Sequence, residues 1–323
     1  MTVEKGYVDA EIPAGVDLVE EIRRLKKEKR AVVLAHYYQR PEVQDVADSV
    51  GDSLAMAQYA ATIRDAEIIV VCGVHFMGET AKLLCPDKKV LIPDMNAGCS
   101  LADSCPPEEF ERFVKAHPDH TVISYVNTSV GVKALTDIVV TSGNARKVVD
   151  SLPSDEKIVF GPDRNLGNHI NSLTGRNMVL WDGACHVHEQ FSLERIMELK
   201  REHPSAKLLV HPECKRALTL VADSVGSTAA LLKYAEESDA KEFIVATESG
   251  ILHELRRRCP EKVFIAAPPT DTTCGCNDCA YMKLVTLEKL YNTLRYELPE
   301  IKIDAEVAER ARRPIERMLE LSK

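Results

Sequence analysis

The stretch "VADSVGDSLAMAQYA" at residues 46–60 occurs again, with few changes, as "VADSVGSTAALLKYA" at residues 221–235. A second pair, "CPDKKVLIP" at 85–93 and "CPEKVFIAA" at 259–267, is separated by nearly the same distance. The offsets are 175 residues (46 to 221) and 174 residues (85 to 259). Two matches at almost one offset indicate an internal repeat, and a repeat determines the predicted fold of the whole chain.

A third, fainter copy lies between these two. The apolar runs "VVLAHYY", "VISYVN" and "LLVHPE" end at residues 36–38, 125–127 and 211–213, with steps of 89 residues (36 to 125) and 86 residues (125 to 211). Each copy continues with a helical stretch, a second apolar run, another helical stretch and a third run. Apolar strands alternating with helices are typical of parallel sheets that are covered on both faces.

The sequence therefore predicts the α/β class, with three similar three-layer α/β/α domains that contain short parallel sheets. The predicted ranges are 1–106 for the first repeat with an N-terminal helix, 107–195 and 196–286 for the second and third repeats, and 287–323 for a C-terminal helical segment packed on the first repeat.

Composition narrows the function classes. The chain has 323 residues, 45% of them hydrophobic and 28% charged, and it contains no apolar run of about 18 residues and no signal-like leader. We therefore expect a cytoplasmic protein without a membrane span. Ten cysteines in a reducing compartment call for a metal or redox explanation. The net charge of −9 and the absence of a basic block argue against a nucleic-acid partner and favour a small molecule.

Polar residues follow the first strand of each repeat. In parallel sheets ligands bind beyond the carboxyl ends of the strands. Small hydroxyl and glycine residues then begin the next helices, in "GDS" (51–53), "TSGN" (141–144) and "GST" (226–228). Free backbone N–H groups at such positions suit a carboxylate or phosphate. Simple N-capping is the alternative, and three equivalent positions favour a shared anionic ligand.

Cysteines follow the third strand of each repeat. They are Cys99, Cys185, and the group Cys274, Cys276 and Cys279. If the three units surround one axis, a thiol from each converges on a single point. Structural zinc sites and most iron–sulfur clusters use four protein ligands, so three thiolates leave one coordination position open for chemistry. A 4Fe-4S cluster with an open iron would act as a Lewis acid, and zinc is an alternative. The cysteines expected to pack in the core are Cys72, Cys85, Cys214 and Cys259.

The stretches "LAHYYQRPEVQDVADSVGDSL", "GVHFMGETAKLL", "NAGCSLADS", "YVNTSVGVKA", "FGPDRNLG", "HPEC" and "CAYMK" resemble the quinolinate synthase family of de novo NAD biosynthesis. The resemblance covers about residues 18 to 295. It implies three α/β domains about a pseudo-threefold axis and a 4Fe-4S cluster held by three cysteines. It also implies condensation of iminoaspartate with dihydroxyacetone phosphate to quinolinate, with loss of phosphate and two waters. Implied partners are the aspartate oxidase or dehydrogenase that makes iminoaspartate, and the iron–sulfur assembly machinery.

The resemblance assigns roles to individual residues. It implies Cys99, Cys185 and Cys279 as cluster ligands, the last because it precedes "AYMK". It implies Tyr38, Tyr125 and Glu213 as the acid and base groups. Substrate-binding residues would be His36, Ser53, Tyr125, Asn127, Ser142, His211, Glu213, Ser227 and Thr228.

Several roles stay open at the level of sequence. One interpretation of Cys274 and Cys276 is a redox role or a role as alternative metal ligands. His186 and His188 are expected to be partners of the metal ligands or packing residues. The alternatives for the whole chain are another iron–sulfur hydratase or dehydratase, a zinc-dependent hydrolase and an electron-transfer protein.

Overall fold

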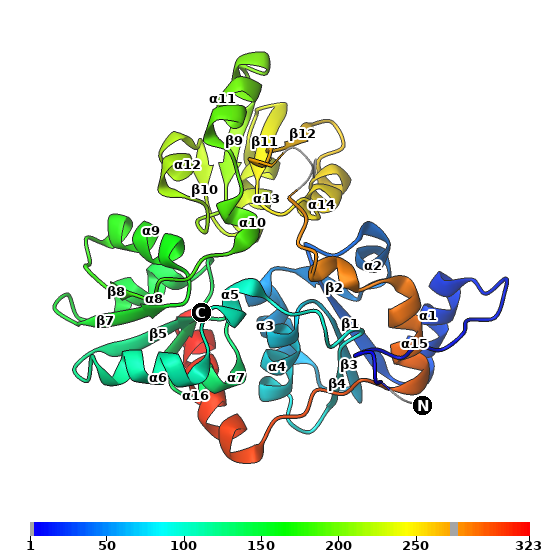
Figure 1. Cartoon of the computed structure of the whole chain (residues 1–323). Helices are drawn as coiled ribbons and strands as arrows, with labels where there is room; N and C mark the ends of the chain where they lie inside the picture. Colours follow the sequence, from blue (N-terminus) through cyan, green and yellow to red (C-terminus); the bar gives the residue numbers. More distant parts are fainter. Residues whose placement is uncertain (1–2, 272–276) are drawn as a thin grey trace.

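The computed structural model describes residues 3–271 and 277–323. Within these residues the chain forms three four-stranded parallel sheets, each flanked by helices, in three lobes around a common centre (Figure 1). The strand orders are equivalent: β2-β1-β3-β4, β6-β5-β7-β8 and β10-β9-β11-β12. The predicted α/β class with three similar domains is confirmed.

The three units have the same succession of elements. The first contains α1 (Leu18–Glu28), β1 (Ala31–His36), α2 (Pro41–Val46), β2 (Ser49–Gly51), α3 (Ser53–Thr62), β3 (Ile68–Cys72), α4 (His75–Leu84), β4 (Lys89–Leu91) and α5 (Ser100–Asp103). The second contains α6 (Pro107–Lys115), β5 (Thr121–Tyr125), α7 (Val130–Lys133), β6 (Ile138–Val140), α8 (Ala145–Ser151), β7 (Ile158–Gly161), α9 (Arg164–Thr174), β8 (Val179–Leu180) and α10 (His186–Glu189). The third contains α11 (Leu193–Glu202), β9 (Lys207–Val210), α12 (Arg216–Val221), β10 (Ser224–Val225), α13 (Thr228–Glu237), β11 (Glu242–Ala246), α14 (Ile251–Arg258), β12 (Val263–Ala266) and the 3₁₀ turn η1 (Met282–Leu284).

Each sheet has one strand more than the sequence predicted. The additional strands β2, β6 and β10 are two or three residues long, too short to give a periodic signal. An aspartate directly precedes each of these strands. Its carboxylate accepts a backbone N–H from the first strand of the same sheet at 2.7 or 2.8 Å, which fixes the short strand to the first one. The pairs are Asp48 with Val33, Asp137 with Val122 and Asp223 with Leu208. The same bond forms in all three sheets, which explains why the aspartate recurs in each repeat.

The central strands are buried on both faces, as parallel strands between two helical layers should be. All residues of β3 and β7 are buried. Helix α1 covers the first sheet with Ile22 and Leu25, while its charged residues face solvent. Its first turn is capped by Asp17, whose side chain accepts N–H bonds from Val19 and Glu20. The rigid sheets thereby fix the positions of the loops at their carboxyl ends.

The C-terminal segment divides between two units. Helix α15 (Leu287–Tyr296) packs on α1 of the first unit. Helix α16 (Ala305–Leu321) differs, because it packs mainly on β6 and α7 of the second unit. Its apolar residues Ala311, Ile315 and Met318 join a core that the first and second units share. The segment therefore connects two lobes, which the spacing of its apolar residues alone does not reveal.

Candidate active site

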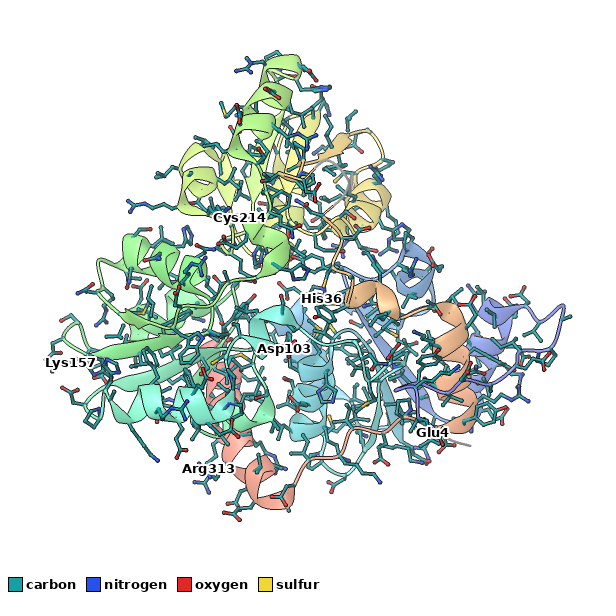
Figure 2. The ribbon with its side chains drawn as sticks, in the orientation of Figure 1. Glu4, His36, Asp103, Lys157, Cys214 and Arg313 are labelled. Atoms are coloured by element: carbon teal, nitrogen blue, oxygen red, sulfur yellow. The ribbon has the colours of Figure 1, made fainter. Side chains whose placement is uncertain are left out.

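A cavity with about 680 Å³ of empty space, its open mouth included, lies where the three units meet. His36 is labelled at this junction in Figure 2. The cavity is lined by all but one of the residues that the sequence suggested, namely His36, Tyr38, Ser53, Cys99, Tyr125, Asn127, Ser142, Cys185, His211, Glu213, Thr228 and Cys279. The exception is Ser227. The fold thus brings together side chains that are up to 243 positions apart in the chain, from residue 36 to residue 279.

Two histidines at equivalent strand ends have the same tautomer. The Nδ1 atom of His36 accepts the backbone N–H of Tyr38 at 3.1 Å, and Nδ1 of His211 accepts that of Glu213 at 3.3 Å. Burial lowers the pKa of both rings to about 3, so both are neutral at pH 7. A neutral ring with Nδ1 as acceptor carries its proton on Nε2. Each histidine therefore has one N–H donor available to a ligand.

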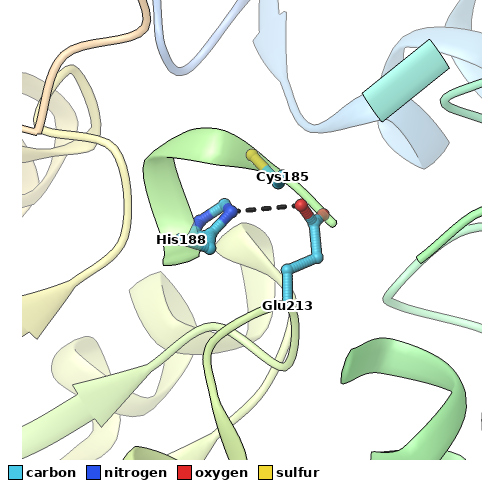
Figure 3. Close-up of side chains that lie close together, drawn as sticks. All are labelled: Cys185, His188 and Glu213. Carbon is cyan, nitrogen blue, oxygen red and sulfur yellow. Dashed lines mark hydrogen bonds and ion pairs between the residues drawn. The ribbon is translucent and has the colours of Figure 1, made fainter. Parts of the chain in front are cut away.

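Glu213 is the ionised carboxylate of the cavity. It accepts a 2.5 Å hydrogen bond from the hydroxyl of Tyr125 and faces Nδ1 of His188 at 3.1 Å (Figure 3). Burial opposes ionisation, yet His188 and the hydrogen bonds from His188 and Tyr125 lower the pKa of Glu213 to about 2. Burial and the charge of Glu213 raise the pKa of nearby Asp163.

Both tyrosines are proton donors. Burial raises the pKa of Tyr38 and of Tyr125 well above 10, and the charge of Glu213 adds to the shift at Tyr125. A phenol with a raised pKa does not act as a base at neutral pH. Of the three acid and base candidates, only Glu213 is in the base form.

A continuous hydrogen-bond chain joins the two tyrosines. The hydroxyl of Tyr38 lies 2.6 Å from Oγ1 of Thr247, which lies 3.0 Å from Nε2 of His188. The other nitrogen of His188 faces Glu213, which is bonded to Tyr125. Sequence reasoning did not select Thr247, although it directly follows β11 and so has the same strand-end position as the residues that were selected.

The small residues at the helix starts differ in their surroundings. Ser53 begins α3, Ser142 lies in the loop before α8, and Thr228 begins α13; all three line the cavity. Ser227 is the N-cap of α13, where its hydroxyl accepts the N–H of Ala230 at 3.3 Å. The capping interpretation therefore describes Ser227. The other three line the cavity, and the hydroxyl of Thr228 lies 2.7 Å from that of Tyr38.

Asn127 has an unused acceptor. Its side-chain oxygen is buried and has no hydrogen-bond partner among the described residues. Asn127 follows β5 and lines the cavity. Buried polar atoms are nearly always bonded in folded proteins, so this oxygen indicates a ligand donor or an ordered water.

The three predicted ligand cysteines have the same local structure. Each stands before a short helical turn: Cys99 before α5, Cys185 before α10 and Cys279 before η1. Backbone N–H groups of the following turn bond to each sulfur, a contact that favours the thiolate. Burial outweighs this effect and raises the pKa of all three thiols, that of Cys99 to about 12. Each unit supplies one partly buried cysteine with thiolate-stabilising donors.

A second carboxylate, which the sequence did not indicate, holds the Cys279 loop. The backbone N–H of Cys279 donates to Oε1 of Glu248 at 3.0 Å, and the N–H of Gly250 donates to Oε2 at 2.7 Å. Glu248 lies two residues after β11 and is buried. Its position beyond a strand end is the signal that would have identified it.

The four cysteines that were expected to pack in the core do so. Cys72, Cys85, Cys214 and Cys259 are buried and free, as packing residues should be. Cys274 and Cys276 lie outside the described residues. Among the histidines beside Cys185, His188 is buried in the hydrogen-bond chain, and Nδ1 of His186 lies 2.6 Å from the hydroxyl of Ser100.

Comparison with known proteins identifies the family. The family model described as quinolinate synthetase A protein matches residues 20–320. The quinolinate synthase of Chloroherpeton thalassium is 55% identical over 308 residues, covering 95% of each chain. That of Thermosynechococcus vestitus is 54% identical over 310 residues, covering 96% of this chain and 97% of the relative. With a match over almost the full length and a cavity that collects the motif residues, the chain belongs to the quinolinate synthetase A protein family.

Proposed function

We propose that this chain condenses iminoaspartate with dihydroxyacetone phosphate to quinolinate, with loss of phosphate and two waters, in de novo NAD biosynthesis. Family membership supports this reaction. The observation that carries it is the convergence of one partly buried cysteine from each unit on a cavity that also holds neutral histidines, small hydroxyl residues and an ionised glutamate. Such a cavity suits small substrates that carry carboxylate and phosphate groups.

A 4Fe-4S cluster fits the donor set. The ligands would be Cys99, Cys185 and Cys279, which line one cavity and form no disulfide. The N–H groups at the following turns would stabilise the bound thiolates. When bound with three protein ligands, the cluster supplies a Lewis-acidic iron open to substrate.

The side chains around the cysteines would bind the anionic groups. His36 and His211 present neutral N–H donors, and Ser53, Ser142 and Thr228 present hydroxyl groups. Neutral donors bind a carboxylate or phosphate without leaving a buried cation behind when the product departs.

Asn127 would accept a hydrogen bond. Its unpartnered oxygen suits an imine N–H or a hydroxyl of the bound substrate. The histidine and hydroxyl donors and the acceptor oxygen of Asn127 all lie near strand ends. They would therefore hold the two substrates in one orientation for condensation.

Proton transfer would involve the chain from Tyr38 to Tyr125. Glu213 is ionised and would remove a proton from the substrate, while the protonated tyrosines would donate to oxygen as water or phosphate leaves. His188 and Thr247 connect the two ends, so a proton taken at one end could return at the other.

We further propose a cytoplasmic enzyme that receives iminoaspartate from an aspartate oxidase or dehydrogenase and its cluster from the iron–sulfur assembly machinery. No helix in the described part of the chain is long and apolar enough to cross a membrane. The instability of an imine in water favours a supplying enzyme close at hand.

The test is an anaerobic assay with defined components. The chain, reconstituted with iron and sulfide, is mixed with dihydroxyacetone phosphate and iminoaspartate made in place, and quinolinate is measured by chromatography. Quinolinate and phosphate in a one-to-one ratio would support the proposal. A cluster-containing chain that forms no quinolinate, or a zinc-loaded chain that forms it equally fast, would contradict it.

A further inference from the structure

Cys185, His188 and Glu213 bring a sulfur, a ring nitrogen and a carboxylate oxygen within 4.8 Å of one another (Figure 3). We propose that in the chain without its cluster these three side chains form a mononuclear site for a zinc-type divalent cation. The proposed cluster shares only Cys185 with this site, so the two metal centres would exclude each other.

The donor set matches the chemistry of zinc. Zinc binds cysteine sulfur, histidine nitrogen and carboxylate oxygen in tetrahedral geometry, with bonds of about 2.0 to 2.3 Å. Such bonds place neighbouring ligand atoms roughly 3.3 to 3.7 Å apart. The Nδ1 atom of His188 already lies 3.1 Å from Oε2 of Glu213, and the Cys185 sulfur lies within 4.8 Å of a ligand atom of each of these two residues.

Each non-sulfur ligand has an outer partner that orients it. Nε2 of His188 lies 3.0 Å from the hydroxyl of Thr247, which leaves Nδ1 for the metal. The other oxygen of Glu213 accepts the 2.5 Å bond from Tyr125. Metal-binding histidines and carboxylates normally have such partners, and these partners fix the ring and the carboxylate before metal arrives.

The charges of the three ligands balance a divalent cation. Bound to the metal, Glu213 would be a carboxylate, Cys185 a thiolate and His188 a neutral imidazole. The side chains of His188 and Glu213 are each only 3% exposed. A buried site is stable when its net charge is near zero, and two negative ligands around one divalent cation meet this condition.

The site is distinct from the three-cysteine set. Cys99 and Cys279 line the same cavity but do not belong to the compact group around Glu213. The fourth coordination position would face the cavity and bind water. A chain that acquired zinc before its cluster would therefore have Cys185 occupied, and cluster assembly would require removal of the zinc.

The test uses the full chain freed of metal and sulfide by anaerobic chelation. It is titrated with Co²⁺, whose thiolate charge-transfer band reports a sulfur ligand, and Zn²⁺ is then added as competitor. We expect one equivalent of Co²⁺ with a thiolate band, displaced by one equivalent of Zn²⁺. Cys185→Ser should abolish the band, and His188→Gln and Glu213→Gln should weaken binding by about 100-fold or more, beyond the loss of an outer partner.

Matched variants separate this site from other modes of binding. Cys99→Ser and Cys279→Ser, which remove cysteines of the same cavity, should keep the band and bind Co²⁺ within about threefold of the unmodified chain. His186→Gln should do the same, since His186 bonds to Ser100. Circular dichroism of every variant establishes that it is folded.

Three results would overturn the proposal. They are Co²⁺ binding without a thiolate band, binding that survives both His188→Gln and Glu213→Gln, and loss of the band in Cys99→Ser and Cys279→Ser as complete as in Cys185→Ser. The last result would mean that the three cysteines hold the metal. Because the titration uses the cluster-free chain, its failure would leave the proposed synthase reaction untouched.

Discussion

The buried carboxylate of Glu248 and the half-buried ammonium group of Lys283 form an ion pair of 2.8 Å beside the cavity. Glu248 also accepts the N–H of Cys279, and Lys283 donates to the backbone oxygen of Tyr38 at 2.7 Å. The pair therefore connects the end of β11, the Cys279 loop and the first unit. It fixes a proposed cluster ligand and a proposed acid group in one arrangement.

Replacing Glu248 by glutamine should loosen the Cys279 loop. The variant leaves the Lys283 charge without its partner and weakens the acceptor for the Cys279 N–H. We expect iron to be lost to a chelator roughly 10- to 100-fold faster, the usual size of the loss of an outer partner of a metal ligand. Release of iron from the reconstituted chain, followed by absorbance, measures this rate.

A control for this variant exists in the same unit. Glu254 of α14 is equally buried, and its side chain pairs with Arg257 and Arg258 away from the cavity. Glu254→Gln should lower the free energy of unfolding, because it removes the charge of a buried carboxylate that pairs with two exposed arginines, and leave the iron-release rate unchanged. Equal iron release from both variants would mean that Glu248 acts only on general stability.

Tyr38→Phe removes one hydroxyl from the hydrogen-bond chain. If Tyr38 donates a proton during loss of water or phosphate, quinolinate formation should fall by about 100-fold or more while the cluster is kept. Tyr37→Phe is the matched control, because Tyr37 is buried next to Tyr38 and does not line the cavity. A Tyr38→Phe rate within about threefold of the unmodified chain would assign Tyr38 to the cavity wall.

The stability of the cluster-free chain should fall on mild acidification. The pKa of His211 is lowered from 6.5 to about 3, so below pH 6.5 the unfolded chain binds a proton that the folded chain does not. Stability is therefore complete above pH 6.5 and declines as the pH falls toward 3. At about 1.4 kcal/mol per pH unit, the contribution between pH 6.5 and pH 5 is roughly 2 kcal/mol.

His211→Gln removes this contribution and should make the decline less steep. Urea unfolding at pH 7 and at pH 5, in the presence of a chelator, provides the two free energies. Glu213 does not interfere in this window, because its lowered pKa affects stability only below the ordinary glutamate value of 4.5. An unchanged difference between the two pH values would contradict the burial of a neutral His211.

Two serines at helix starts should respond differently to alanine. Ser53 lines the cavity, so Ser53→Ala should raise the KM for the substrate it binds. Ser227 caps α13, so Ser227→Ala should cost about 1 kcal/mol of stability and leave KM unchanged. Steady-state kinetics and urea unfolding of both variants test this. A raised KM in Ser227→Ala would support the substrate-binding role that the sequence suggested.

Much of the fold could be predicted because the internal repeat is detectable as similar segments of sequence. The segments at 46–60 and 221–235 align, and both contain an aspartate that bonds to the neighbouring first strand. The edge strands β2, β6 and β10, two or three residues long, were missed, whereas the opposite edge strands were predicted from their apolar runs. The path of α16 was missed as well, because an amphipathic helix shows which face is buried but not which surface covers it.

The site was predictable where chemistry and position coincide. His36, Tyr125 and His211 follow the first strands at regular steps, and the cysteines follow the third strands. Thr247 and Glu248 were missed because they follow a middle strand, and their roles depend on contacts between units. Contacts across units bring together residues far apart in the chain, and no local pattern encodes them.

The central claim is that one cysteine from each unit holds the cluster. The most direct test is the iron content of anaerobically reconstituted Cys99→Ala, Cys185→Ala and Cys279→Ala beside Cys274→Ala and Cys276→Ala. The claim predicts about four irons per chain in the last two and none retained in the first three. A full cluster in Cys279→Ala, or loss of the cluster in Cys276→Ala, would contradict it.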